Sequence, residues 1–452
     1  MDKYEDFTDF MRYDEKNQIV YTSSEDQFHQ TYQMSTVILE NLAGGQVDSE
    51  LLDYWKAEAG NGDLFCLCCL AFYFSEGRQD SRPDLGLTLW QKAAGTGFPF
   101  ALYCLGLFHH KGLDGRFDQA LAVQFWLMAA ERGQTEAQYA LGQAYYLGEG
   151  LTKNSKIAAS WFFKAAQKHM PGAQFMLGQM YLEGDGGLPV NHDQAVFWLS
   201  KAAENGYDDA YAYLGVCYLE GSGVPRDQKL AVDMLKKAAE IGHSGAEICL
   251  GACYRKGLGV KEDIGEAIAW YMKAAGRGVP VAAYNLAVIY CHGDGVPEDQ
   301  PLCRFWFQKA ADLEHLPSMA ELSKLFIMGL GGPKEGDKGL ALLNRVVLAD
   351  PQTKDDELAI AEAQYYLGLV FLEGFEVVEP DPLAAVGWWE KAARRGHLEA
   401  QHNLGLVYME GRPGIEPDRA RSDYWFQMAI SQDVDEWEEE LQEENHDSKS
   451  RH

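Results

Sequence analysis

The stretch LGACYRKGLGVKED, residues 250–263, places three glycines beside arginine, lysine and cysteine side chains. A glycine-rich loop next to a lysine can cradle a phosphate group through its backbone N–H groups. Cys249 stands four residues before Cys253, and on a helix this spacing sets two thiolates on one face, as a metal site requires. The alternatives are a phosphate site, a metal site, or a turn between two helices without chemistry.

The rest of the chain repeats this stretch. YLGVCYLEGSGVPRD covers residues 213–227, MLGQMYLEGDGG covers 176–187 and NLGLVYMEG covers 403–411. A small residue recurs at intervals of 35 to 37 residues, with one interval of 45, and a glycine follows six residues after each. A fixed period in the thirties indicates a helical repeat array. The small residues are Ala71, Gly106, Gly142, Gly178, Gly215, Gly251, Ala287, Ser323, Gly368 and Gly405.

Each period contains the pattern of two helices. In the first, as at residues 246–254, alanine, leucine and tyrosine recur on one face, and the later glycine ends the helix. The second begins at an aspartate or asparagine that caps free N–H groups, and it continues into an apolar stripe with the letters KAA. We expect the lysine of KAA to lay its stem over this stripe. The predicted N-caps are Asp118, Asn154, Asn191, Asp227, Asp263, Asp299, Asp381 and Asp418.

The consensus A-x-x-x-L-G-x-x-Y-x-x-G-x-G-V-x-x-D-x-x-x-A-x-x-W-x-x-K-A-A-x-x-G resembles the Sel-like repeat (SLR), a relative of the tetratricopeptide repeat. The resemblance covers roughly residues 64–432 in one phase. It implies an all-α fold, a right-handed α/α solenoid superhelix of about ten helix-turn-helix repeats. It also implies a protein-interaction scaffold, because the positions that the family shares are architectural and none is catalytic.

The repeats divide the chain into parts. Residues 1–48 are acidic and show no repeat, and residues 27–42 within them can form an amphipathic helix that caps the first repeat. The solenoid is predicted over residues 49–432. It begins with a half repeat at 49–62, and ten repeats follow at 63–432.

Two stretches depart from the pattern. The eighth repeat has lost its Leu-Gly pair and KAA and is nine residues longer than the others. We expect a longer turn there, which bends the superhelix, makes a protruding contact, or is only a tolerated surface insertion. Residues 433–452 hold nine acids and two bases, with Val434, Trp437 and Leu441 on one helical face. They are predicted to be an acidic cap and tail, either solvated or docking a basic partner.

The charge of the chain restricts its partners. Its 452 residues carry 39 Lys and Arg against 68 Asp and Glu, a formal charge of −29. Such a field repels nucleic acid and anionic lipid, whereas it suits a basic protein or simply keeps the chain soluble. The sequence shows no apolar leader and no run of 18 apolar residues. Nine scattered cysteines therefore favour reduced thiols and a cytoplasmic location.

The repeat answers the opening question. A phosphate loop needs G-x-x-x-x-G-K-[ST] after a strand, whereas this phrase follows a helix and occurs ten times. Cys253 occupies a column that Cys217 and other apolar residues also fill, and no further ligands complete a metal set. Cys66, Cys68 and Cys69 lie in an apolar helix, where buried thiols are inert. We therefore expect no metal, no cofactor and no enzymatic activity.

With no site for chemistry expected, we expect the protein to act by binding a partner at its surface. In tetratricopeptide-type arrays the residues three before, one after and four after the small residue face a concave groove, and the resemblance carries these columns over. An aromatic and aliphatic groove suits a helix or an extended peptide, although the aromatics three before the small residue could equally be repeat packing. Arg255 is the only charge in the last column of the intact repeats. The predicted partner-binding residues are Tyr103, Leu107, His110, Tyr139, Gln143, Tyr146, Phe175, Gln179, Leu182, Arg255, Tyr284, Tyr365 and His402.

The sequence leaves three functions open. The favoured one is a non-catalytic scaffold or adaptor that binds a protein or peptide along the concave groove. The second is a bacterial immunity-type or inhibitory protein that neutralises a basic partner, because an acidic surface speeds association with a cation. The third is a hydrolase whose site is hidden in the groove.

Overall fold

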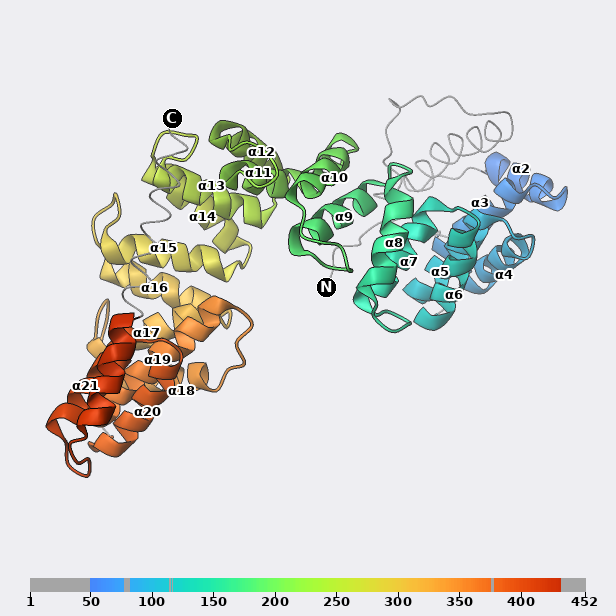
Figure 1. Cartoon of the computed structure of the whole chain (residues 1–452). Coiled ribbons are helices and arrows are strands. Elements are labelled where there is room, and N and C mark those ends of the chain that lie inside the picture. Colours follow the sequence, from blue (N-terminus) through green and yellow to red (C-terminus); the bar gives the residue numbers. More distant parts are fainter. Residues whose placement is uncertain (1–48, 77–81, 114, 116, 375–377, 432–452) are drawn as a thin grey trace. The chain divides into compact units, whose positions relative to one another are not determined.

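The computed structural model is built of helices joined by turns (Figure 1). In the described part of the chain there is no β-strand, although an isolated bridge pairs Arg412 with Ile415. The all-α prediction is confirmed. The predicted capping segments at residues 1–48 and 433–452 lie outside the described residues, which are 49–76, 82–113, 115, 117–374 and 378–431.

The chain divides into two compact units, Met1–Arg226 and Asp227–His452. In the first unit, the two helices of a repeat pack against each other, and the second helix also packs against the first helix of the next repeat. This alternation is the packing order of a helical solenoid. The helices are α2 (Ser49–Gly60), α3 (Leu64–Glu76), α4 (Pro83–Ala94), α5 (Pro99–Lys111), α6 (Gln119–Glu131), α7 (Thr135–Leu147), α8 (Ser155–Ala166), α9 (Pro171–Glu183), α10 (His192–Glu204) and α11 (Ala210–Glu220).

The second unit shows the same alternation. Residues 419–431 are also helical and provide the second helix of its last repeat. Its other helices are α12 (Gln228–Glu240), α13 (Ser244–Lys256), α14 (Ile264–Gly276), α15 (Pro280–His292), α16 (Gln300–Ala311), α17 (Leu316–Met328), α18 (Gly336–Val347), α19 (Lys354–Glu373), α20 (Pro382–Arg394) and α21 (Leu398–Glu410).

The helices begin and end at the predicted residues. Every predicted second-helix N-cap accepts a hydrogen bond from a first-turn N–H, as Asp118 does from Leu121 at 2.9 Å. The first helices end at glycines with positive φ, and at Gly148 φ is 80° while its N–H bonds to the Ala144 carbonyl. Both predictions are confirmed. Three first helices begin at histidine caps that we did not predict, namely His243, His315 and His397.

The recurring small residue lies where the two helices of one repeat touch. A Cβ atom added at Gly142 would stand 2.6 Å from the Phe162 ring, and one added at Gly251 would stand 2.6 Å from the Tyr271 ring. Both rings are buried. A larger residue at either glycine would separate the helices, because the interior has no room to absorb it. The prediction that the small residue permits close helix packing is confirmed.

The lysines of KAA cover aromatic rings on the second helices. The Nζ atom of Lys164 lies 3.7 Å from the centre of the Trp161 ring, and Lys273 and Trp270 repeat this arrangement at 3.7 Å. The lysine stem therefore lies on the apolar stripe as predicted, and the ammonium gains a cation–π contact.

A buried glutamine column joins consecutive repeats. The glutamine stands four residues before the small residue, and its Nε2 donates to a carbonyl at the end of the preceding second helix. Each of these carbonyls also accepts a backbone N–H from the turn that follows its helix, so the glutamine adds a second bond that links the two repeats. The pairs are Gln138 to Ala130 at 3.2 Å, Gln174 to Ala166 at 3.2 Å and Gln401 to Ala393 at 3.1 Å.

Replacing Gln174 with leucine should lower the free energy of unfolding by about 1–3 kcal/mol, because the change removes the two hydrogen bonds that this buried amide makes. Gln174 bonds Ala166 and also accepts a bond of 2.8 Å from Asn205. Urea unfolding of the full chain measures the effect. The control Gln124→Leu, on the exposed side of α6, should change stability by no more than about 0.5 kcal/mol. Equal effects at the two positions would show that the buried bonds contribute nothing.

The eighth repeat differs from its predicted form. Its extra residues lengthen a helix more than a turn, since α19 has 20 residues whereas α5 has 13 and α11 has 11. A capping box starts α19, in which the Thr353 side chain and the Asp356 side chain each bond the other's backbone N–H. Ala359 and Ile360 in the added turns are buried against the core. The insertion is therefore packed structure, not a long surface turn.

Candidate functional site

The aromatics three residues before the small residue are mostly packing residues. Tyr103, Tyr139 and Phe175 are only 5%, 4% and 8% exposed. Tyr139 lies 5.8 Å from the Phe162 ring, centre to centre. For these three side chains the packing alternative describes the structure, and they offer a partner almost no surface. In the second unit Tyr284 and Tyr365 are half-buried, and His402 is exposed.

The columns one and four residues after the small residue keep partial exposure. They include Leu107 and His110 on α5, Gln143 and Tyr146 on α7, and Gln179 and Leu182 on α9, all of them half-buried. We call these six residues the groove columns of the first unit. Side chains of aromatic, aliphatic and amide type are therefore partly exposed along successive first helices.

Hydrogen bonds hold the polar members of the groove columns in place. Gln143 donates from Nε2 to the Tyr139 hydroxyl at 3.1 Å, within α7. Gln179 donates from Nε2 to the Tyr213 hydroxyl at 2.7 Å, which joins α9 to α11. His110 bonds Gln119 through Nδ1 at 2.7 Å. The surface is thus preorganised by contacts within and between repeats.

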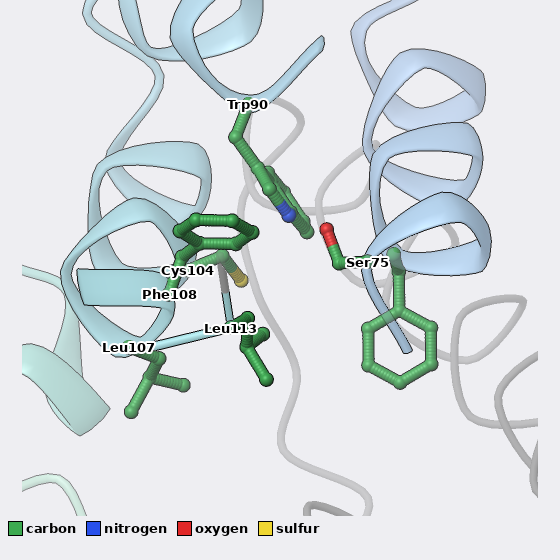
Figure 2. Close-up of a pocket in the computed structure, with 7 residues that line it drawn as sticks. Ser75, Trp90, Cys104, Leu107, Phe108 and Leu113 are labelled. Atoms are coloured by element: carbon green, nitrogen blue, oxygen red, sulfur yellow. The ribbon is translucent and has the colours of Figure 1, made fainter. Parts of the chain in front are cut away.

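A small pocket lies beside Leu107 (Figure 2). Ser75 contributes a hydroxyl, but that hydroxyl already donates to the Ala71 carbonyl at 2.7 Å. The pocket therefore has little to recognise a polar ligand, and it offers only apolar contact. Its lining residues are Phe72, Ser75, Trp90, Cys104, Leu107, Phe108 and Leu113.

Arg255 meets an acidic partner within the chain. Its Nε lies 2.6 Å from Oδ2 of Asp294, at the start of the turn that follows α15. The two side chains are 28% and 38% exposed, so the pair lies at the surface. The residue that stood out as the one charge in its column is therefore already neutralised by the next repeat.

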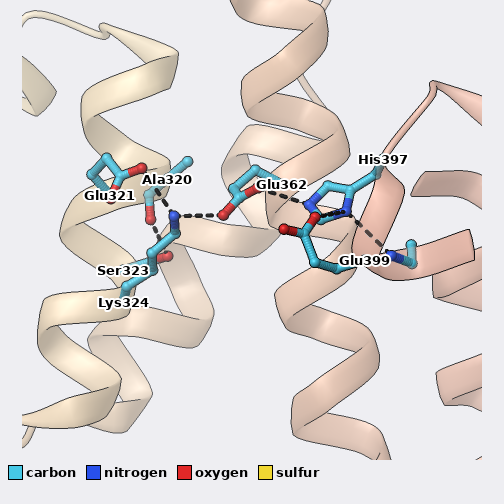
Figure 3. Close-up of polar contacts among 8 residues, drawn as sticks. Ala320, Glu321, Ser323, Lys324, Glu362, His397 and Glu399 are labelled. Atoms are coloured by element: carbon cyan, nitrogen blue, oxygen red, sulfur yellow. Dashed lines mark hydrogen bonds and ion pairs between the residues drawn. The ribbon is translucent and has the colours of Figure 1, made fainter. Parts of the chain in front are cut away.

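A charged cluster joins α17, α19 and α21 (Figure 3). Lys324 stands one residue after the small residue Ser323, and its Nζ lies 2.9 Å from Glu321 and 2.5 Å from Glu362. Burial opposes the charge on Glu362, but hydrogen bonds from His397 and Lys324 outweigh it and lower the pKa of Glu362 to about 2. Burial likewise opposes the charge on Lys324, and the two carboxylates raise the pKa of Lys324 above its usual range.

Both ring nitrogens of His397 serve structural bonds. Nδ1 accepts a hydrogen bond from the Ala400 N–H at 3.3 Å and so caps α21. Nε2 is then the protonated nitrogen, and it lies 2.7 Å from Glu362. The Tyr365 ring stacks on His397 with the ring centres 4.5 Å apart. Oε2 of Glu399 also lies 3.2 Å from Nδ1, so His397 links the start of α21 to the carboxylate of Glu362 on α19.

The sequence model of the Sel1 repeat matches more than half of the chain. The chain belongs to the Sel1 repeat family. The matches leave out residues 63–98 and 316–360, where we predicted the first and eighth repeats and where the structure has the helix pairs α3–α4 and α17–α18. The matched segments are residues 99–134, 135–169, 171–207, 208–243, 246–279, 280–315, 361–397 and 398–434.

Two of three similar solved structures share the repeat fold with TM-scores above 0.5. A protective antigen of uropathogenic Escherichia coli with an SLR fold is 27% identical, and the match covers 91% of this chain and 87% of that one with a TM-score of 0.69. A Sel1 repeat protein from Oxalobacter formigenes is 26% identical, with coverages of 80% and 99% and a TM-score of 0.54. An immunity protein from Pseudomonas aeruginosa is 24% identical over 50% of this chain and 82% of its own, with a TM-score of 0.33. A search of curated proteins found no significant match.

The Sel1 repeat packing brings two cysteines into a disulfide that we did not predict. We expected all nine thiols to be reduced, but the sulfur atoms of Cys291 and Cys303 form a disulfide. The pairing arises because α15 and α16 pack as one repeat and bring the two Cα atoms to 5.1 Å. Six of the seven free cysteines are buried, and burial raises the pKa of Cys217 and Cys253 to about 11, as inert packing residues require. The cytoplasmic location stays a prediction.

Two features are absent from the residues that the structure describes, a cluster of metal-ligating side chains and a membrane-spanning helix. Among them no three His, Cys, Asp or Glu side chains converge as metal ligands would. None of the described helices combines the length and the apolar character needed to cross a bilayer.

Proposed function

We propose that this Sel1 repeat protein is a non-catalytic scaffold that binds a protein or peptide along its first helices. Sel1 repeats generally mediate protein–protein interaction and are typically non-catalytic. The observation that carries the proposal is the partial exposure of the groove columns on the first helices of three successive repeats, α5, α7 and α9. Apolar and aromatic side chains that stay partly exposed in a regular row are typical of a binding surface.

The exposure of the groove residues decides which of them can be replaced to test binding. Tyr139 is buried, so replacing it would disturb folding and binding together. Gln143, Tyr146 and Leu182 are half-buried, and polar replacements there can act on binding while the core stays packed.

Changing Gln143, Tyr146 and Leu182 together to serine should weaken partner binding at least tenfold. The partner would first be identified by crosslinking and mass spectrometry, and then purified for titration against the full chain. The matched control replaces Phe163 and Phe197 with serine, because these side chains on the second helices are 43% and 49% exposed. If the control weakens binding and the groove variant does not, the binding face has been assigned to the wrong helices.

The net charge supports a second candidate, a protein that neutralises a basic partner. A formal charge of −29 speeds association with a cationic surface, and salt screens that attraction. Neutralisation by net charge requires that the association rate fall steeply as the salt concentration rises. An association rate that stays the same between low and high salt would exclude electrostatic neutralisation.

A further inference from the structure

Equivalent positions in two repeat pairs carry different residues. In the second unit, Arg255 stands four residues after its small residue and reaches Asp294, which stands seven residues after the small residue of the next repeat, with Nε and Oδ2 2.6 Å apart. In the first unit the same two positions hold Tyr146 and Asp185. We call the site formed by these two positions the corner. In the second unit an arginine of the chain itself occupies the corner and pairs with its carboxylate.

Tyr146 cannot neutralise the carboxylate that it faces. The Tyr146 hydroxyl is hydrogen-bonded to Asp185, and the Gly186 N–H donates to Oδ1 of Asp185 at 2.5 Å. Burial, and then the nearby carboxylates of Asp185 and Glu183, raise the pKa of Tyr146, so both donors to Asp185 are uncharged and its negative charge is not balanced. Among the described residues no lysine or arginine forms an ion pair with Asp185 or Glu183. Lys153 instead lies over the Tyr146 ring, 5.6 Å from its centre.

The surroundings suit the stem of a long cationic side chain. Leu182 lies near the end of α9, three residues before Asp185; it is half-buried and packs against the cluster that contains Phe175 and Leu214. An aromatic face beside a carboxylate attracts a guanidinium or an ammonium, and an aliphatic wall covers its methylene groups. The corner therefore combines an apolar floor with an acidic edge.

We propose that Tyr146, Leu182 and Asp185 receive an arginine or lysine side chain from a basic amphipathic segment of a partner protein. The cation takes the place that is equivalent to that of Arg255 in the second unit. The inference rests on the proposed function and adds the chemistry of the partner. A second copy of the chain is a poor occupant, because two molecules with a formal charge of −29 repel each other. A small free cation would leave the apolar floor uncovered.

The first experiment measures binding of a defined peptide to the full chain. The probe is a fluorescein-labelled 18-residue amphipathic helix of leucine, alanine and glutamine with three arginines, followed by fluorescence anisotropy at low salt. Asp185→Asn should weaken binding about tenfold. The control Glu131→Gln, an exposed acid at the end of α6, makes the same change in net charge and should alter the affinity less than twofold. Equal losses in the two variants would reveal only long-range attraction and overturn the proposal.

The second experiment fills the corner from within. Tyr146→Arg should abolish binding of the same peptide while the melting temperature stays unchanged or rises, because the new guanidinium meets Asp185 as Arg255 meets Asp294. The reciprocal variant Arg255→Tyr exposes Asp294 and should add a second binding site in calorimetric titration. Undiminished binding by Tyr146→Arg, or the absence of a second site in Arg255→Tyr, would overturn the equivalence on which the proposal rests.

Changing the probe shows whether the corner binds an arginine side chain, apolar groups alone or a small free cation. A peptide with citrulline in place of arginine should bind at least tenfold more weakly, and equal binding would mean that the surface recognises apolar groups alone. Agmatine, a free guanidinium compound, should compete only at concentrations far above that of the peptide, and competition at similar concentrations would assign the corner to a small cation. If Asp185→Asn has no effect while the triple serine variant still loses its partner, this inference fails and the proposed function stands.

Discussion

Replacing Gly368 with alanine is expected to lower the free energy of unfolding by about 2–4 kcal/mol, near the upper end for a single added methyl group. A Cβ atom there would overlap Nε1 and Cδ1 of Trp389 on the neighbouring helix. Trp389 is fully buried, and its indole donates to the Tyr365 carbonyl at 3.1 Å. The ring can move only by breaking this bond or by separating α19 from α20. Urea unfolding of the full chain measures the loss.

Gly387 provides the matched control on the same helix pair. It lies on the exposed side of α20, and an added Cβ would meet nothing within 4 Å. Gly387→Ala should therefore stabilise the protein by about 0.5–1 kcal/mol, because alanine loses less backbone freedom in a helix than glycine does. Both substitutions replace glycine with alanine, yet they should change the free energy of unfolding in opposite directions. A stabilising Gly368→Ala would show that close packing of α19 on α20 is not needed.

The repeat architecture could be predicted from the sequence because its determinants are local. A capping aspartate, a glycine that accepts positive φ and an apolar stripe each act within one or two helical turns. Asp118 and Gly148 therefore identify helix ends without knowledge of the neighbouring repeats. The same local reasoning overlooked His243 and its equivalents, although histidine recurs at that position and its Nδ1 can accept the capping bond.

Burial of the aromatic column could not be predicted, because it depends on the next repeat. Tyr139 is covered by the Phe162 ring and also by Gly172, where an added Cβ would stand 2.8 Å from the phenol. Phe162 and Gly172 lie on the next two helices along the chain. A residue type and its column do not show how closely those helices approach.

The cluster around Lys324 was missed although the sequence carried a signal. Lys324 occupies a column that holds Gln143 and Gln179 in the intact repeats, and a cation there is unusual. Its partner Glu362 lies one repeat further on, and His397, which bonds Glu362, lies two repeats further on, so no local pattern joins the three. Comparing the charge at this column from repeat to repeat would have singled out Lys324 as a residue that needs an acidic partner.

Replacing Glu362 with glutamine is expected to lower the free energy of unfolding by about 2 kcal/mol at pH 7. The folded state holds the pKa of Glu362 at about 2 instead of its ordinary 4.5. The expected loss of about 2 kcal/mol is smaller than this pKa difference alone would give, because the Glu362 side chain is 31% exposed and solvent screens its charge. Above pH 4.5 the carboxylate is ionised in both the folded and the unfolded state, so the stabilisation is complete. Between pH 4.5 and 2 the unfolded state binds the proton first, and the stabilisation is lost as the pH falls.

Urea unfolding of wild type and Glu362→Gln at pH 7, 4.5 and 3 measures this dependence as a difference that shrinks towards low pH. The subtraction is needed because many other carboxylates also titrate in this range. Glu357→Gln is the control, since Glu357 lies on the same helix in an exposed ion pair with Arg395 at 3.2 Å and should contribute no more than about 1 kcal/mol. A difference that stays constant from pH 7 to 3 would mean that the Glu362 carboxylate gains nothing from Lys324 and His397.

The double variant Lys324→Met with Glu362→Gln decides whether the cluster acts as a unit. Each single change leaves a partly buried group without its opposite charge, whereas the double change removes both charges together. The loss in the double variant should therefore be smaller than the sum of the two single losses. Additive losses would show that Lys324 is stabilised by Glu321 alone, at 2.9 Å, and that α17 and α19 are held together by apolar packing without the ion pair.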